Sequence, residues 1–221
     1  MGILYLHACK NTMTKQIIFF LLLLFSLNSC VERRDLSINT VVNHITIQPD
    51  GLHPYNDNSS IRSFVFQYTQ KTVTKLDLVS LEYIPQLAKE LPIISEDGLA
   101  YTYELHGGIK WDDGTPLTAE DVVFSTKVML CPLTNNAQIR SNYTTVIKSV
   151  VVDKKNPLKF TMYAHDVNYT NADIFSELYI QQKSYWDPNG VLDNLSFEQI
   201  FATKFKETEA LTGWFNSYND G

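Results

Sequence analysis

The 221 residues include 18 lysine and arginine residues and 24 aspartate and glutamate residues, which gives a formal net charge of −6. An acidic chain without a lysine or arginine cluster does not fit nucleic-acid binding, which needs a basic surface to neutralise phosphates. The content of 44% hydrophobic and 12% aromatic residues is typical of a globular protein and excludes a disordered chain.

The chain begins with a segment that is typical of export. Lys15 precedes an apolar run at residues 17–27. The run is shorter than the roughly 20 residues that cross a bilayer, and it has the length of the hydrophobic part of a signal peptide. Residues 13–29 are therefore predicted to be a signal peptide that starts at Met13, and residues 1–12 a wrongly assigned upstream extension.

The end of this segment, LNSC, resembles the lipobox of bacterial lipoproteins. The resemblance implies that Cys30 is diacylated and becomes the first residue of the mature chain. Two acyl chains are enough for stable attachment to a membrane. Cys131 is then the remaining thiol of the mature chain, so no disulfide framework is expected, and its apolar neighbourhood predicts a buried structural residue.

Hydrophobic periodicity predicts a mixture of strands and helices beyond the signal peptide. In chain order the predictions are a strand at residues 41–47, a helix at 61–68, a short helical turn at 84–88, a strand at 99–105, two strands at 147–152 and 158–163 joined by a turn, and helices at 171–183 and 196–205. This mixture indicates an α/β or α+β protein and excludes an all-α or all-β fold.

The stretch KWDDGTPLTAEDVVFS holds four carboxylates. Asp112 and Asp113 precede glycine and threonine, which predicts a turn. Thr118 is expected to be a helix N-cap, with Asp121 three residues later as in a capping box, and Glu120 and Asp121 face the positive end of that helix. The core side of the helix is predicted to consist of Ala119, Val122, Val123, Thr126, Met129 and Leu130. Each carboxylate is thus given a structural role.

Catalytic and metal-binding alternatives for these acids match the sequence less well. An EF-hand loop counted from Asp112 needs a glutamate at position twelve, where Val123 stands. The chain has no Gly-x-Ser-x-Gly, His-Glu-x-x-His or Cys-x-x-Cys motif. No catalytic residue, metal ligand or cofactor is therefore predicted, and the chain is not expected to be an enzyme. Spacing alone leaves open a secreted envelope hydrolase that uses loop carboxylates.

The same stretch resembles a signature of the family 5 extracellular solute-binding proteins, the dipeptide, oligopeptide and nickel receptors of ABC importers. Four further stretches resemble family motifs in the same order, namely QPDGLHPYN, IPQLAKEL, YTYELHGGIKW and IKSVVVDKKNPLKFTMY. The resemblance implies a mixed α/β (α+β) fold, the N-terminal portion of a type II clamshell of the periplasmic-binding-protein kind, whose lobes close on a ligand by a hinge.

The resemblance also implies a domain organisation. Residues 30–54 would be the anchor linker and the first strand of lobe I, residues 55–170 a small mixed α/β subdomain, and residues 171–221 a return into lobe I. Members of the family are much longer, so the chain is expected to be a fragment truncated before the second lobe. Such a fragment would bind its ligand weakly or not at all.

The implied function is a receptor that is lipid-anchored in the periplasm or on the extracytoplasmic face of the membrane. It would deliver a peptide or another small solute to ABC permease subunits without covalent chemistry. In the family's peptide receptors the ligand lies extended and pairs through its main chain. The loop that forms one wall of the cleft corresponds to Gln48, Pro49, Asp50 and Gly51, although a simple turn is equally compatible with these residues. A non-catalytic lipoprotein for protein–protein contact is a third alternative.

Overall fold

The computed structural model describes residues 42–48, 51–55, 59–176, 178–202 and 209–220. The chain divides into a short unit, Met1–His44, and a larger unit, Ile45–Gly221, and the elements below belong to the larger unit. The predictions for the signal peptide, the upstream extension and Cys30 lie outside the described residues. In the described ranges no helix combines the length and the apolar character that a membrane span requires.

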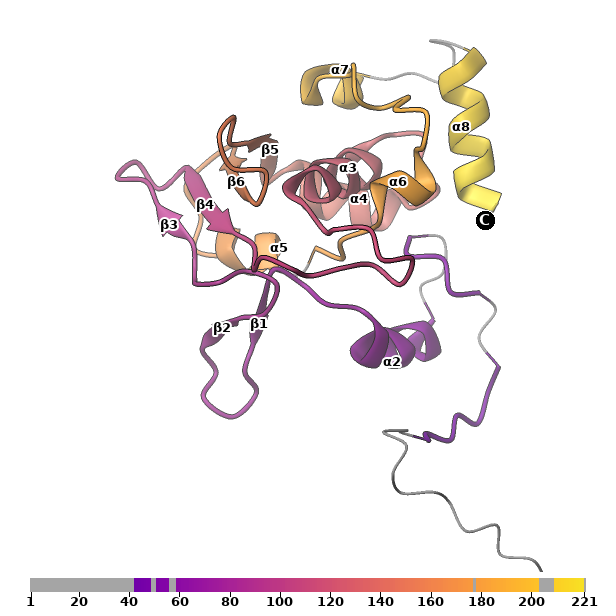
Figure 1. Cartoon of the computed structure of the whole chain (residues 1–221), viewed down its shortest axis with the longest axis horizontal. Coiled ribbons are helices and arrows are strands. Elements are labelled where there is room, and N and C mark those ends of the chain that lie inside the picture. Colours follow the sequence, from indigo (N-terminus) through magenta and orange to yellow (C-terminus); the bar gives the residue numbers. More distant parts are fainter. Residues whose placement is uncertain (1–41, 49–50, 56–58, 177, 203–208, 221) are drawn as a thin grey trace, which may run out of the picture. The chain divides into compact units, whose positions relative to one another are not determined.

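A four-stranded antiparallel sheet carries much of the core of the larger unit (Figure 1). In spatial order its strands are β3 (Ile93–Ile94), β4 (Ala100–Glu104), β6 (Lys159–Ala164) and β5 (Ile147–Val152). The alternation predicted for residues 99–105 is confirmed, because Tyr101, Tyr103 and Leu105 are buried on one face. Tyr103 lies opposite Phe160 in the register, and the two rings stack with centroids 5.4 Å apart. The predicted hairpin of residues 147–163 is confirmed as β5 and β6.

Helices and a second, two-stranded sheet complete the described chain. The helices are α2 (Ser60–Thr69), α3 (Ala119–Leu130), α4 (Ala137–Thr144), α5 (Asn171–Ser176), α6 (Lys183–Trp186), α7 (Phe197–Ala202) and α8 (Glu209–Asp220). The second sheet pairs β1 (Thr74–Leu76) with β2 (Tyr83–Pro85). The helix predicted at residues 61–68 is confirmed as α2.

Helix α3 is buried on nearly all sides. The predicted core side is too narrow, because Phe124, Ser125, Lys127 and Val128 are buried as well. The cause is the number of elements around the helix, since α3 packs against β5, α4, α6 and α7 (Figure 1). A helix in this position must satisfy its polar groups within the protein, because water cannot reach them.

Two of the predictions made from the sequence are wrong. Residues 42–47 form no strand, and Val42 and Ile47 remain 60% and 66% exposed. An alternating sequence forms a strand only where a neighbour pairs with it, and no described segment does so here. The helical turn predicted at residues 84–88 is extended, because the N–H groups of Leu87 and Ala88 donate to the carbonyl of Val73 at 3.1 and 3.0 Å.

Two predicted helices have different limits. The helix predicted at residues 171–183 ends at Ser176, and residues 178–182 form no regular secondary structure although Leu178, Ile180 and Gln181 are buried. The N–H of Gln181 donates to the Ser125 hydroxyl at 2.7 Å, so a contact with α3 replaces the next helical turns. The helix predicted at residues 196–205 is confirmed as α7, and the last part of that prediction lies outside the described residues.

The stacked pair in the sheet gives a test of this core. Phe160→Ala removes a fully buried ring and should lower the free energy of unfolding by about 3–5 kcal/mol, because it leaves a cavity beside Tyr103. Chemical denaturation measures the change. Val151→Ala, at a half-exposed position of β5, is the control and should cost less than about 1 kcal/mol. Equal losses in the two variants would contradict this description of the core.

Candidate functional site

The four residues predicted to form a ligand wall are only partly covered by the structure. Gln48 is exposed in irregular backbone, and Gly51 is half-buried. Pro49 and Asp50 lie outside the described residues. A Cβ atom added to Gly51 would meet nothing within 4 Å, so space is open beside its backbone.

The segment that follows Gly51 is held by a buried histidine. The Nδ1 atom of His53 accepts the Tyr55 N–H at 3.1 Å, and its Nε2 atom therefore carries the proton and donates to the Tyr218 carbonyl at 2.8 Å. Burial of His53 lowers its pKa, despite the opposing effect of the bond to Tyr218, and so favours the neutral ring. The contact fixes residues 51–55 to α8.

Aromatic rings from α6 and α8 surround this histidine. Trp186 meets the His53 ring edge-on with centroids 5.8 Å apart and meets Tyr218 in the same way at 5.0 Å. Trp214 stacks on Tyr218 at 5.1 Å, and its Nε1–H donates to the Trp186 carbonyl at 3.0 Å. The segment after the predicted ligand wall is thus built on a rigid aromatic cluster.

A cavity of about 230 Å³ lies beside the same segment. Its lining combines Leu52 and Pro54 of the segment with aromatic residues of other elements, among them Phe66, Trp111, Tyr179, Tyr185 and Trp186. No aspartate, glutamate, lysine or histidine is among the lining residues. The lining also includes Gln70, Gln181 and Gln182, so the cavity suits an uncharged group of about the size of one side chain.

The first acidic pair of the KWDDGTPLTAEDVVFS stretch forms the predicted turn. The carboxylate of Asp113 accepts the hydroxyl and the N–H of Thr115 at 2.7 and 2.9 Å and the Gln182 amide at 2.6 Å. These bonds lower the pKa of Asp113, and the bond from the Thr115 hydroxyl has the largest effect. Gly114 has a φ of 86°, as the turn requires. The Asp112 side chain is exposed and has no hydrogen bond among the described residues, so only its backbone serves the turn.

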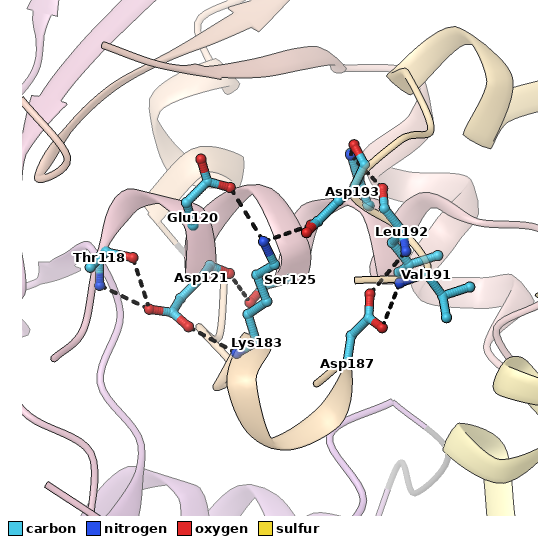
Figure 2. Close-up of polar contacts among 10 residues, drawn as sticks. Thr118, Glu120, Asp121, Ser125, Lys183, Asp187, Val191, Leu192 and Asp193 are labelled. Atoms are coloured by element: carbon cyan, nitrogen blue, oxygen red, sulfur yellow. Dashed lines mark hydrogen bonds and ion pairs between the residues drawn. The ribbon is translucent and has the colours of Figure 1, made fainter. Parts of the chain in front are cut away.

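The second acidic pair forms the start of α3 (Figure 2). Thr118 is the N-cap in an extended conformation, and its N–H donates to the Asp121 carboxylate at 2.8 Å, which confirms the predicted capping box. The other oxygen of Asp121 accepts the Lys183 N–H at 2.8 Å. A single buried carboxylate therefore joins the start of α3 to the start of α6.

Lysine side chains complete this network. The Lys183 ammonium lies 2.6 Å from an Asp193 oxygen and 3.7 Å from a Glu120 oxygen (Figure 2). Partial burial opposes ionisation, but the hydrogen bond and charge of Asp193 and the charge of Glu120 outweigh it and raise the pKa of Lys183. The ammonium of the buried Lys127 donates to the Leu192 carbonyl at 2.7 Å, and burial lowers its pKa.

A buried aspartate shapes the loop that these lysines contact. The two carboxylate oxygens of Asp187 accept the Val191 N–H at 2.8 Å and the Leu192 N–H at 2.9 Å (Figure 2). The sequence analysis missed this residue, and also the roles of Lys127 and Lys183. The turn sequence Asp187-Pro-Asn-Gly was the available signal for the loop, whereas nothing local indicated which carbonyl groups the lysines would contact.

The chemistry of these acids is that of a scaffold. The carboxylates of Asp113 and Asp121 accept backbone and amide donors. Glu120 and Asp193 line a cavity of about 510 Å³, and both face the Lys183 ammonium there. Within the described ranges, no three side chains of the His, Cys, Asp and Glu types come together as metal ligands would. Cys131 is buried, as predicted, and burial raises its pKa to about 11, which keeps the thiol protonated.

The family model for the middle region of the bacterial extracellular solute-binding proteins, family 5, matches residues 82–211. This range is more than half of the 221 residues and includes the capped helix α3, both acidic pairs and the β5–β6 hairpin. The chain belongs to this family. The family consists of extracellular or periplasmic solute-binding proteins that work with ABC transporter permeases.

Individual relatives agree with this membership. The oligopeptide-binding protein OppA of Bacillus subtilis is 31% identical over 101 residues, which are 45% of this chain and 18% of OppA. The solved structure of AppA from Bacillus subtilis, in complex with a nonapeptide, matches with a TM-score of 0.50 and 25% identity over 68% of this chain and 28% of AppA. DppA of Helicobacter pylori, at 18% identity and a TM-score of 0.53, shares the fold over 69% of this chain and 32% of DppA.

These likenesses confirm the predicted fold class, which is the mixed helix and sheet of a type II periplasmic binding protein. The chain spans only 18% of the length of OppA and 28% of the length of AppA. The motifs of the resemblance that lie within residues 82–211 thus belong to the part of the chain that matches the family model.

The bridging carboxylate gives the first test of this site. Asp121→Ala leaves the N–H groups of Thr118 and Lys183 without their acceptor and should lower the free energy of unfolding by about 2–3 kcal/mol. Chemical denaturation measures the loss. Asp112→Ala, at the exposed neighbour, is the matched control and should change stability by less than about 0.5 kcal/mol. A neutral Asp121→Ala variant would contradict the structural role.

The neutral histidine gives a second test. The pKa of His53 is lower in the folded protein than its ordinary value of 6.5, so protonation favours the unfolded chain. This contribution to stability is complete above about pH 6.5 and is lost as the pH falls through the folded-state pKa. Urea denaturation between pH 7.5 and 5 should show that His53→Gln, although less stable, loses less stability on acidification than the wild type. Parallel pH profiles would rule out this role.

Proposed function

We propose that this chain belongs to a lipid-anchored receptor that binds peptides outside the cytoplasmic membrane and delivers them to an ABC permease without chemical conversion. The match of the family 5 model to residues 82–211 carries the proposal. Peptides are the favoured solute because OppA is an oligopeptide-binding protein and the AppA structure holds a nonapeptide. The diacyl group on Cys30 and an extracytoplasmic location follow from the lipobox resemblance.

The proposed ligand contact is the loop formed by Gln48, Pro49, Asp50 and Gly51. An extended peptide pairs with a protein mainly through main-chain N–H and C=O groups. Pro49 has no N–H, so donors would come from the backbone of Asp50 and Gly51 or from the exposed amide of Gln48. The open space beside Gly51 allows the backbone of a ligand to approach closely.

The neighbouring aromatic cavity supports the same proposal. Its volume of about 230 Å³ matches one amino-acid side chain, and its lining of apolar, aromatic and glutamine residues favours an uncharged one. A peptide that pairs with Gly51 could place a side chain there, because Leu52 follows Gly51 directly in the chain. The rigid attachment of residues 51–55 through His53 would keep the main-chain donors in place before the ligand arrives.

Acid/base chemistry receives less support. The hydrolase alternative requires a pair of free carboxylates close together. In the KWDDGTPLTAEDVVFS stretch Asp113 and Asp121 are committed to turn and helix-cap donors and Glu120 faces Lys183, so Asp112 is the free acid. A family of solute-binding proteins also gives no precedent for turnover. We therefore assign no catalytic residue and no cofactor.

Two substitutions of Gly51 test the ligand contact. Gly51→Pro removes the N–H donor, whereas Gly51→Ala keeps it, and an added Cβ atom has room in both variants. Titration with an oligopeptide, followed by the NMR shift of neighbouring amides, detects weak binding. We expect Gly51→Pro to bind about 10-fold more weakly than the wild type, the equivalent of one hydrogen bond, and Gly51→Ala to bind equally well. Peptide-dependent shifts of other amides in the wild type, without shifts in residues 48–55, would contradict the proposed ligand contact.

A further inference from the structure

The β1–β2 hairpin ends in a loop with an unusual surface. Leu78, Val79 and Leu81 are 80%, 93% and 72% exposed, and they lie within four consecutive residues. In Figure 1 this loop extends away from the four-stranded sheet. Single exposed apolar residues are common, but a cluster at the end of a hairpin marks a contact with an apolar partner.

The root of the hairpin is fixed in the core, in contrast to its end. Val73 and Ala88 are fully buried, and the Ala88 N–H donates to the Val73 carbonyl at 3.0 Å. The exposed end is therefore held out on a rigid base. A loosely attached loop could fold Leu78 and Leu81 back onto the protein, but both side chains are exposed here.

Several polar groups of the loop are paired within the loop itself. The Asp77 side chain accepts the Val79 N–H at 3.1 Å and the Ser80 hydroxyl at 3.0 Å, and these bonds lower its pKa. The Leu81 N–H donates to the Asp77 carbonyl at 2.8 Å, and the Asp77 N–H to the Glu82 carbonyl at 2.9 Å. These bonds hold the loop in a defined turn at the end of the hairpin.

No burial within the described chain explains a leucine at position 81. Its φ of 59° lies in the left-handed region, where glycine or asparagine is the usual choice and a bulky residue is strained. The side chain is largely exposed, so it gains no burial in return for the strain. Strain kept at an exposed position indicates that the residue serves a contact outside the fold.

We propose that the loop at residues 78–81 inserts its apolar side chains into the surface of the lipid bilayer to which the protein is attached. The proposal rests on the lipid anchor of the proposed function. The chain between Cys30 and Gly51 can span at most about 70 Å, so an anchored protein stays close to the membrane at all times. At such a high effective concentration, three aliphatic side chains suffice for a second, weak contact that orients the protein.

A fluorescence experiment on the acylated protein tests this proposal. Val79→Cys carries an environment-sensitive fluorophore, and the protein is reconstituted in vesicles of phosphatidylethanolamine and phosphatidylglycerol. The matched control is Lys154→Cys, which places the same fluorophore on the exposed β5–β6 turn. Cys131 is buried and does not compete for the label. We expect a blue-shifted emission and quenching by spin-labelled lipid at position 79, and neither effect at position 154.

Further variants decide between the possible explanations. Adding Leu78→Ser and Leu81→Gly should bring the signal at position 79 to the level of the control, while the fold is kept because glycine relieves the strain at position 81. Equal signals at positions 79 and 154 in an acylated protein would overturn the insertion. A shift that needs added permease subunits would replace the bilayer by a protein partner. Absence of acyl mass on Cys30, with loss of protein from the vesicles, would overturn the anchor and the insertion together.

Discussion

The carboxylate of Asp121 is the contact on which the arrangement of the described chain depends. Helix α3 is surrounded by protein, so the N–H groups at its start cannot be hydrated and need an internal acceptor. One oxygen of Asp121 meets this need at the Thr118 N–H, and the other holds the Lys183 N–H. The first bond sets where α3 begins, and the second sets where α6 begins relative to it.

The neighbouring ion pairs follow from this bridge. Once the backbone of Lys183 is fixed, its ammonium lies within reach of Glu120 and Asp193 (Figure 2). Lys127, farther along α3, reaches the carbonyl of Leu192. Half-exposed ion pairs contribute little stability on their own. Their effect here is to select one position for the loop of residues 187–193, whose turn Asp187 closes with its own carboxylate.

Features that depend on residues close in sequence could be predicted, and features that depend on distant partners could not. The cap of α3 needs only Thr118 and Asp121, three residues apart, and the hairpin at 147–163 needs only alternation around a turn. The stretch at 84–88 has the composition of a helical turn, yet the Val73 carbonyl draws its N–H groups into an extended pairing. The candidate ligand wall was located by a family motif. The aromatic cluster that holds the following segment combines His53, Trp186 and Tyr218, which no local pattern connects.

The bond between His53 and Tyr218 has a consequence for the order in which the protein folds. It joins two positions that are 165 residues apart, one of the most distant pairings in the described chain. Loop-closure entropy opposes such a pairing until the segments between are already ordered. The bond between His53 and α8 can therefore form only after most of the chain is in place, whereas the capped helix and the hairpin depend on residues that are close in sequence.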